Sequence, residues 1–149
     1  MKEIQIDPNS ITTSLVTYHS GKKDENFFIK QEILRKSIEY LTKQNLIHQI
    51  AIVDNSKVPH FKWLLNISEK IIYHHNGENI GFGRGHNLCR KLLEYKKYHL
   101  IINPDLRFAD NEILKKIIIY LEKNKDIGLI QPLIRDYDSE NIQTMCRRN

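Results

Sequence analysis

Short apolar runs alternate with longer segments of helical periodicity along this sequence, and this alternation limits the possible folds more than any other feature. The runs are rich in β-branched and aromatic residues, and they span residues 11–18, 46–53, 70–75, 98–102 and 127–134. In the segments between them, apolar residues recur every three or four positions, as on one face of a helix. Strands that alternate with helices predict an α/β fold with a mostly parallel sheet flanked by helices.

The expected helices cover residues 25–44, 59–67 and 85–96, and a fourth follows Asp110. Asp24 and Asp110 are suitable N-cap residues for the first and the last of them. Pro132 interrupts the fifth apolar run, which indicates an edge strand or a bend. Residues 141–145 are interpreted as a last short strand.

The composition fits one globular domain over residues 1–149 with a sizeable core. Lysine and arginine outnumber the acidic residues 23 to 18, and the net charge of +5 favours anionic partners such as nucleotides, nucleic acid or a membrane surface. The basic residues are dispersed, with short groupings only at Lys96-Lys97 and Arg147-Arg148. Because no RNP-like or helix-turn-helix pattern accompanies them, nucleic-acid binding is not expected.

The two cysteines, Cys89 and Cys146, fit no C-x-x-C metal or redox pattern. Cys89 lies on the apolar side of a predicted helix and is expected in the core. No signal segment opens the sequence, and its apolar runs are far shorter than the about 20 residues of a transmembrane helix. We therefore expect a reducing, cytoplasmic environment.

The most distinctive segment is Asn79–Asn87 (NIGFGRGHN), which sets glycines at alternate positions just before a helical pattern. Glycine tolerates positive φ and lets a ligand approach the backbone closely, and the start of a helix suits phosphate. The dinucleotide fingerprint would need glycine where His86 stands, and the Walker A ending is absent. A tight strand-to-helix turn without any ligand explains the same residues equally well.

Two carboxylates follow predicted strands, Asp54 after residues 46–53 and Asp105 after residues 98–102. The carboxyl ends of parallel strands meet at one edge of a sheet, where α/β proteins bind their ligands. An ordinary turn explains either carboxylate taken alone. Together with the glycine segment, they suggest a nucleoside diphosphate bound with a metal ion.

Four motifs also carry a resemblance to a known family. The sequence resembles the family 2 glycosyltransferases, and within them the bacterial rhamnosyltransferase-like branch that works on lipopolysaccharide and capsule. The motifs come in that family's order and spacing, and they are Ser14–Tyr18, Ile52–Ser56, Asn79–Asn87 and Ile102–Asp105. The similarity runs from about Thr12 to the last residue, and it implies a GT-A fold that binds a nucleotide-sugar.

The resemblance also implies roles for individual residues. Thr17 and Tyr18 would line the base pocket, and Asp54 would accept a hydrogen bond from the pyrimidine N–H. The residues that would border the ribose and the diphosphate are Asn79, Gly81, Gly83 and Asn87. Arg84 would assist at the diphosphate, although an arginine that faces solvent at a helix start is an equal alternative.

Asp105 would take the place of the last carboxylate of the family's D-x-D motif and hold Mg²⁺ or Mn²⁺ on the diphosphate. Asn103 stands where many relatives have aspartate, so this metal site is expected to be weaker. Family members are longer, and their second half supplies the acceptor site and the catalytic base. No residue is therefore assigned as the base, and the sequence is interpreted as a donor-binding half.

Two functions from different classes follow. The first is a glycosyltransferase, or its donor-binding half, that transfers a sugar such as rhamnose from a dTDP- or UDP-linked donor to a saccharide or lipid-linked acceptor. Such an enzyme would work at the inner face of the cell membrane, and peripheral membrane association and a homo-oligomer stay open. The second is a catalytically inactive nucleotide-binding module that regulates or scaffolds a glycan assembly complex.

Overall fold

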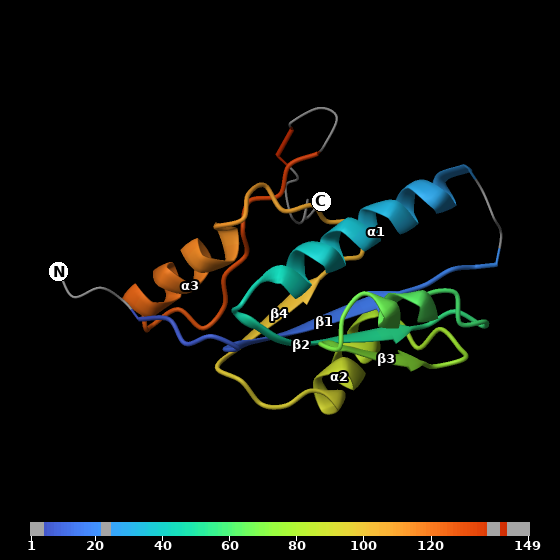
Figure 1. Cartoon of the computed structure of the whole chain (residues 1–149), viewed down its shortest axis with the longest axis horizontal. Coiled ribbons are helices and arrows are strands. Elements are labelled where there is room, and N and C mark those ends of the chain that lie inside the picture. The colour runs from blue at the N-terminus through green and yellow to red at the C-terminus, as the bar shows by residue number, and fades with distance from the viewer. Residues whose placement is uncertain (1–4, 22–24, 137–140, 143–149) are drawn as a thin grey trace, which may run out of the picture.

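A four-stranded parallel sheet forms the centre of the computed structural model, which describes residues 5–21, 25–136 and 141–142 (Figure 1). All strand pairs are parallel, and the strand order is β3-β2-β1-β4. This confirms the predicted α/β class and the parallel sheet. The strands are β1 (Ile11–Thr17), β2 (Ile47–Asp54), β3 (Ile71–His75) and β4 (Tyr98–Ile102), and the helices are α1 (Glu25–Lys43), the 3-10 helix η1 (Lys62–Asn66), α2 (Phe82–Leu92) and α3 (Ile113–Lys123).

Strand β1 is the centre of the core because every one of its seven residues is buried. Leu15 pairs with Ile52 of β2 on one side and with Ile102 of β4 on the other, and all three side chains are buried. A strand covered on both faces needs no polar alternation, and β-branched residues suit it well.

The two faces of the sheet carry separate apolar clusters. In Figure 1, α1 lies above the sheet and α2 below it. The larger cluster joins the strands to α1 and α3, through residues such as Ile38 and Ile118. The smaller cluster places Cys89 of α2 against Ala51 and Val53 of β2, which confirms the expected core position of this cysteine.

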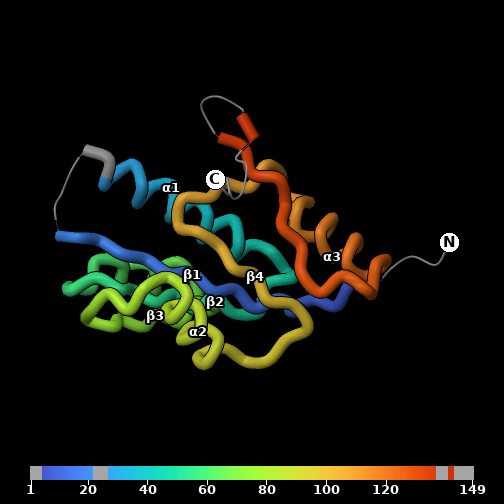
Figure 2. Tube along the Cα trace, turned by 180° about the vertical axis from the view of Figure 1, so that it is seen from behind, coloured from blue at the N-terminus to red at the C-terminus, as the bar shows by residue number. Residues whose placement is uncertain are grey.

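The topology creates a switch point beside β1. The chain crosses from β1 to β2 through α1, whereas it leaves β3 through α2 and returns as β4 on the other side of β1 (Figure 2). In open α/β sheets, ligands bind outside the carboxyl ends of the strands where the strand order reverses in this way. The fold therefore directs attention to the residues that follow β1, β2 and β4.

Three sequence-based boundaries are wrong. Helix α2 begins at Phe82, so Gly83 and Gly85 belong to its first turns and only Gly81 precedes it. The segment before β3 forms the 3-10 helix η1 over Lys62–Asn66, without a helix from Pro59. The N-cap of α3 is Glu112 and not the predicted Asp110, whose carboxylate accepts the Glu112 N–H at 2.8 Å.

The predicted strand over residues 127–134 is also wrong. Within the described residues this segment pairs with no strand, and the only bridge nearby joins Arg135 to Ile142 in the antiparallel sense. Pro132 has no N–H to donate to a ladder. Leu129 and Leu133 lie 87% and 62% exposed, so no packing against a core compensates for missing strand pairing. The N-cap prediction at Asp24 and residues 143–145 of the last predicted strand fall outside the described residues.

No helix in the described ranges is both long enough and apolar enough to span a bilayer.

Candidate functional site

Asp54 ends β2 at the carboxyl edge, and its carboxylate is completely buried. One oxygen accepts the Ser56 N–H at 2.9 Å, and the other accepts the Tyr73 hydroxyl at 2.6 Å. Burial, and then the bond to Asp54, raise the pKa of Tyr73, so its phenol remains a proton donor at neutral pH. Because Asp54 has no exposed surface, a nucleobase could reach this carboxylate only if a neighbouring group moved.

Two buried oxygen atoms beside Asp54 have no hydrogen-bond partner within the described residues. They are Thr17 Oγ1 at the end of β1 and Asn55 Oδ1 just after β2. The two residues are neighbours, because the Asn55 N–H donates to the Thr17 carbonyl at 2.8 Å. An unsatisfied buried acceptor or donor costs about 1–3 kcal/mol, so a ligand or ordered water that pairs with these atoms would stabilise the edge.

Asn55 also links this edge to the glycine segment. Its side-chain amide donates to the Gly81 carbonyl at 3.3 Å and to Asn79 Oδ1 at 3.5 Å. Asn79 Oδ1 in turn accepts the Gly81 N–H at 3.0 Å. Asn79 and Gly81 therefore lie beside Asn55 at the end of β2, and their predicted roles at the ribose and the diphosphate stay predictions. Sequence analysis missed Asn55, and its only signal was a second polar residue after the carboxylate of a predicted strand.

The start of α2 is open to a ligand. Gly81 has φ 86° and ψ 166°, and no side chain caps the helix. The first N–H groups of α2 thus lack a side-chain partner, and the positive end of the helix dipole lies with them. Gly83 is exposed, and an added Cβ there would meet no atom within 4 Å. Uncapped N–H groups beside open space are suited to phosphate.

Arg84 and Asn87 lie in the first half of α2. Both are exposed and lie three residues apart on α2, on the face away from the buried Gly85 and Cys89. Their roles at the ribose and the diphosphate stay predictions. Tyr18, which follows β1 directly, is 55% exposed and is available to a ligand at the edge.

Asn103 and Asp105 follow β4, whose last residue Ile102 pairs with Leu15 two positions before Thr17. Both are exposed. The Asp105 carboxylate makes no hydrogen bond or ion pair with another described residue, so its oxygens are available. The end of β4 thus brings a free carboxylate to the same edge of the sheet as Thr17.

A metal at this edge would need ligands from outside the protein. The described part of the chain holds no group of three or more His, Cys, Asp or Glu that could form a closed metal site. Mg²⁺ commonly takes one or two carboxylates together with substrate phosphates and waters. Asp105 alone therefore fits Mg²⁺ or Mn²⁺ shared with a diphosphate, and it does not fit a permanent structural metal.

An aromatic group that sequence analysis missed lies just after β1. The His19 ring lies 4.1 Å from the Phe27 ring and 4.5 Å from the His60 ring, measured between centroids. The backbone N–H of His19 donates to Ser56 Oγ at 2.8 Å, and this bond connects the aromatic group to the segment after Asp54. No motif identified these rings, because they meet only when β1, α1 and the segment after β2 pack together.

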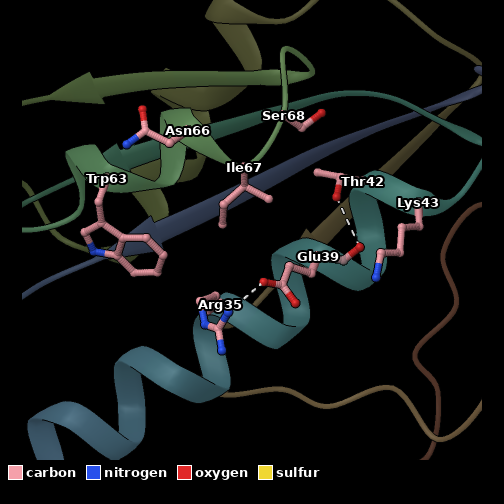
Figure 3. A pocket seen from close by; sticks show the side chains of 8 residues that line it. All are labelled: Arg35, Glu39, Thr42, Lys43, Trp63, Asn66, Ile67 and Ser68. Carbon is pink, nitrogen blue, oxygen red and sulfur yellow. Dashed lines mark hydrogen bonds and ion pairs between the residues drawn. The ribbon is translucent and has the colours of Figure 1, made fainter.

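A groove of the described structure lies elsewhere. It has a volume of about 800 Å³ and lies between α1 and the segment from η1 to β3 (Figure 3). Its lining residues are Arg35, Glu39, Thr42, Lys43, Trp63, Asn66, Ile67 and Ser68. Lys43 ends α1 and Ser68 precedes β3, so the groove lies toward the amino ends of β2 and β3. The polar groups at the carboxyl edge make that edge a better candidate than the groove.

The sequence matches no protein-family model and no curated protein. The likeness to family 2 glycosyltransferases therefore remains a resemblance of four motifs. Thr17 and Asp54 end β1 and β2, and Asp105 follows β4. Asn79 and Gly81 lie between β3 and α2. These positions are independent of that resemblance.

Proposed function

We propose that the carboxyl edge of the sheet binds the nucleoside diphosphate part of a nucleotide-sugar together with Mg²⁺ or Mn²⁺, and that the protein is a glycosyltransferase or its donor-binding half. The observation that carries this proposal is the pair of unpartnered buried oxygens, Thr17 Oγ1 and Asn55 Oδ1, at the ends of neighbouring strands. Buried polar atoms normally find partners. Because Thr17 and Asn55 are only 1% and 2% exposed, a polar ligand would supply those partners once a neighbouring group moved, as at Asp54.

The residues around this pair support a division of roles. The uncapped start of α2 after Gly81 would hold the diphosphate through backbone N–H groups. The Asp105 carboxylate would hold the metal, which supplies Lewis-acid stabilisation of a departing nucleoside diphosphate when it is bound. Tyr18 and the rings of His19 and His60 offer flat surfaces against which a nucleobase can stack.

The second candidate is an inactive nucleotide-binding module, and Asn103 favours it. An uncharged residue at this position leaves one carboxylate in the proposed metal site. Incubation with UDP- or dTDP-linked sugars and Mg²⁺ separates the two functions. A transferase, or its donor-binding half, should slowly release UDP or dTDP, whereas a binding module should release none.

Metal-dependent nucleotide binding is the first expected result. Calorimetry with UDP and dTDP should show binding in the presence of Mg²⁺ or Mn²⁺ that EDTA largely abolishes. Asp105→Ala should weaken the binding by about tenfold or more, which is about 1.4 kcal/mol, because it removes the only proposed protein ligand of the metal. Asp126→Ala is the matched control, since Asp126 is also an exposed acid but follows α3.

Equal affinity in EDTA would refute the role of the metal, and the absence of any binding would refute the site. If Asp105→Ala and Asp126→Ala bind as the unaltered protein does, Asp105 belongs to an ordinary turn.

A further inference from the structure

A line of four hydrogen-bonded side chains connects β4, β1 and α2 on the α2 side of the sheet. His99 Nδ1 lies 3.0 Å from Thr12 Oγ1, and His99 Nε2 lies 3.0 Å from Ser14 Oγ. Ser14 Oγ lies 2.8 Å from His86 Nδ1. We call Thr12, His99, Ser14 and His86 the histidine cluster. None of them was assigned to the nucleotide site.

The two histidines of the cluster differ in their access to water. His99 is exposed on β4, whereas Ser14 is fully buried and His86 is only 6% exposed. His86 Nε2 is buried and has no hydrogen-bond partner within the described residues. A proton from solvent can thus reach His99 directly, but it cannot reach His86 without movement of α2.

We assign one direction to these hydrogen bonds when both histidines are neutral, because it leaves no donor in the cluster unpaired among the described residues. The Thr12 hydroxyl donates to the Tyr98 carbonyl at 3.4 Å, so Thr12 Oγ1 accepts from His99 Nδ1–H. His99 Nε2 is then an acceptor and takes the Ser14 hydroxyl proton. Ser14 Oγ is left to accept from His86 Nδ1–H. His86 Nε2 carries no proton in this state, so its burial leaves no donor unpaired.

A proton on His99 reverses part of this pattern. Both ring nitrogens of His99 become donors, and His99 Nε2–H then donates to Ser14 Oγ. The Ser14 hydroxyl loses its acceptor on His99, and the other partner of Ser14 Oγ among the described residues is His86 Nδ1, which can accept the hydroxyl only without its own hydrogen. His86 then carries its hydrogen on Nε2, where no partner is available among the described residues. One proton is taken up in total, and the neutral ring of His86 changes tautomer.

We propose that the histidine cluster is a proton-sensitive latch, in which uptake of a proton by His99 reverses the Ser14–His86 bond, leaves His86 Nε2–H buried without a partner among the described residues, and so loosens the first half of α2. His86 lies one turn after Phe82 on α2, and the centroids of their two rings are 4.3 Å apart. Loosening of this turn would disorder the N–H groups that follow Gly81. The consequence for nucleotide binding rests on the proposed function, whereas the latch itself does not.

The surroundings oppose a positive charge in the histidine cluster. Burial lowers the pKa of both histidines; the neighbouring His99 lowers that of His86 further, and Arg90 of α2 lowers that of His99. The residues of β1 that contact the two histidines are Thr12 and Ser14, and both are uncharged. Because the folded protein binds these protons less readily than the unfolded chain, stability is complete above the ordinary histidine pKa of about 6.5 and falls as the pH decreases below it.

Imidazole ¹⁵N shifts test the latch, since they distinguish a ring with hydrogen on Nδ1 from one with hydrogen on Nε2. At about pH 8, His86 should carry its hydrogen on Nδ1. As His99 titrates, His86 should change to the Nε2–H form with the same midpoint. In His99→Gln, a change at an exposed site, that midpoint should disappear. In Ser14→Ala, His99 should titrate without the change at His86.

Thr13→Val is the matched control for Ser14→Ala. Thr13 is the adjacent residue, equally buried, and its hydroxyl has no partner within the described ranges, so the coupled change should persist in this variant. A His86 tautomer that stays constant while His99 titrates would overturn the proposal. So would a coupled change that survives in Ser14→Ala.

A binding measurement separates the latch from the proposed function. The affinity for UDP with Mg²⁺ should fall more steeply between about pH 8 and about pH 5.5 in the unaltered protein than in His99→Gln. Titration of the phosphate itself affects both proteins equally. A tautomer change without UDP binding would sustain the latch and refute the nucleotide site. UDP binding with the same pH dependence in both proteins would refute the link between them.

Discussion

Gly85→Ala should destabilise the fold by about 1–3 kcal/mol, the usual cost of overpacking a core. An added Cβ at Gly85 would lie 2.7 Å from Val16 Cγ2 and 2.9 Å from Val16 Cγ1. Val16 cannot give way easily, because it is a stiff β-branched residue in the central strand and only 7% exposed. Either α2 must move away from β1 or the strand must distort.

Gly83→Ala is the matched control two residues earlier on the same helix. An added Cβ at Gly83 meets nothing within 4 Å, and the residue lacks the positive φ that favours glycine. Alanine should therefore stabilise the helix by about 0.5–1 kcal/mol. Urea unfolding followed by circular dichroism should give midpoints that move in opposite directions for the two variants. Midpoints that move together would show that helix propensity, and not contact with Val16, decides both.

The second large effect is expected at Asp54. Asp54→Ala removes the acceptor of both the Ser56 N–H and the Tyr73 hydroxyl. At about 1–3 kcal/mol for each of the two unsatisfied groups, the free energy of unfolding should fall by about 2–6 kcal/mol. Asp54→Asn should cost less, because its carbonyl oxygen can still accept one of these bonds. Asp105→Ala, at an exposed turn, should remain within about 0.5 kcal/mol of the unaltered protein.

Chemical unfolding of the three variants decides between two roles for Asp54. A large loss in Asp54→Ala with a small loss in Asp105→Ala indicates that Asp54 organises the edge from within. Similar small losses in both would mean that the buried bonds of Asp54 contribute little. Its predicted contact with a nucleobase would then be its principal role.

The sheet was predictable because its signals are local. The β-branched runs of β1 and β4 and the apolar stripe that includes Leu34 and Ile38 specify strands and helices without knowledge of their partners. The parallel arrangement follows because a helix separates most successive strands. Residues 127–134 have a similar apolar composition, yet they form no strand among the described residues, since a strand also requires a neighbour with which to pair.

The candidate site was predictable only in outline. Strand ends meet at one edge, so Asp54 and Asp105 were expected there. The burial of Asp54 was not predictable, because Tyr73 reaches it from β3 across the sheet. The start of α2 before Gly85 and the contact of His86 with Ser14 were missed for the same reason, as both depend on packing against β1. Sequence periodicity describes one element at a time and cannot supply such contacts.

The central claim is that a nucleoside diphosphate binds at the carboxyl edge of the sheet. Backbone amide NMR during titration with UDP and Mg²⁺ tests it most directly, because the edge and the groove along α1 carry different residues. The account predicts shift changes at Thr17, Asn55, Gly81 and Asp105, with the indole N–H of Trp63 in the groove unaffected. Changes confined to Trp63 and its neighbours, or no changes at a saturating concentration of UDP, would contradict it.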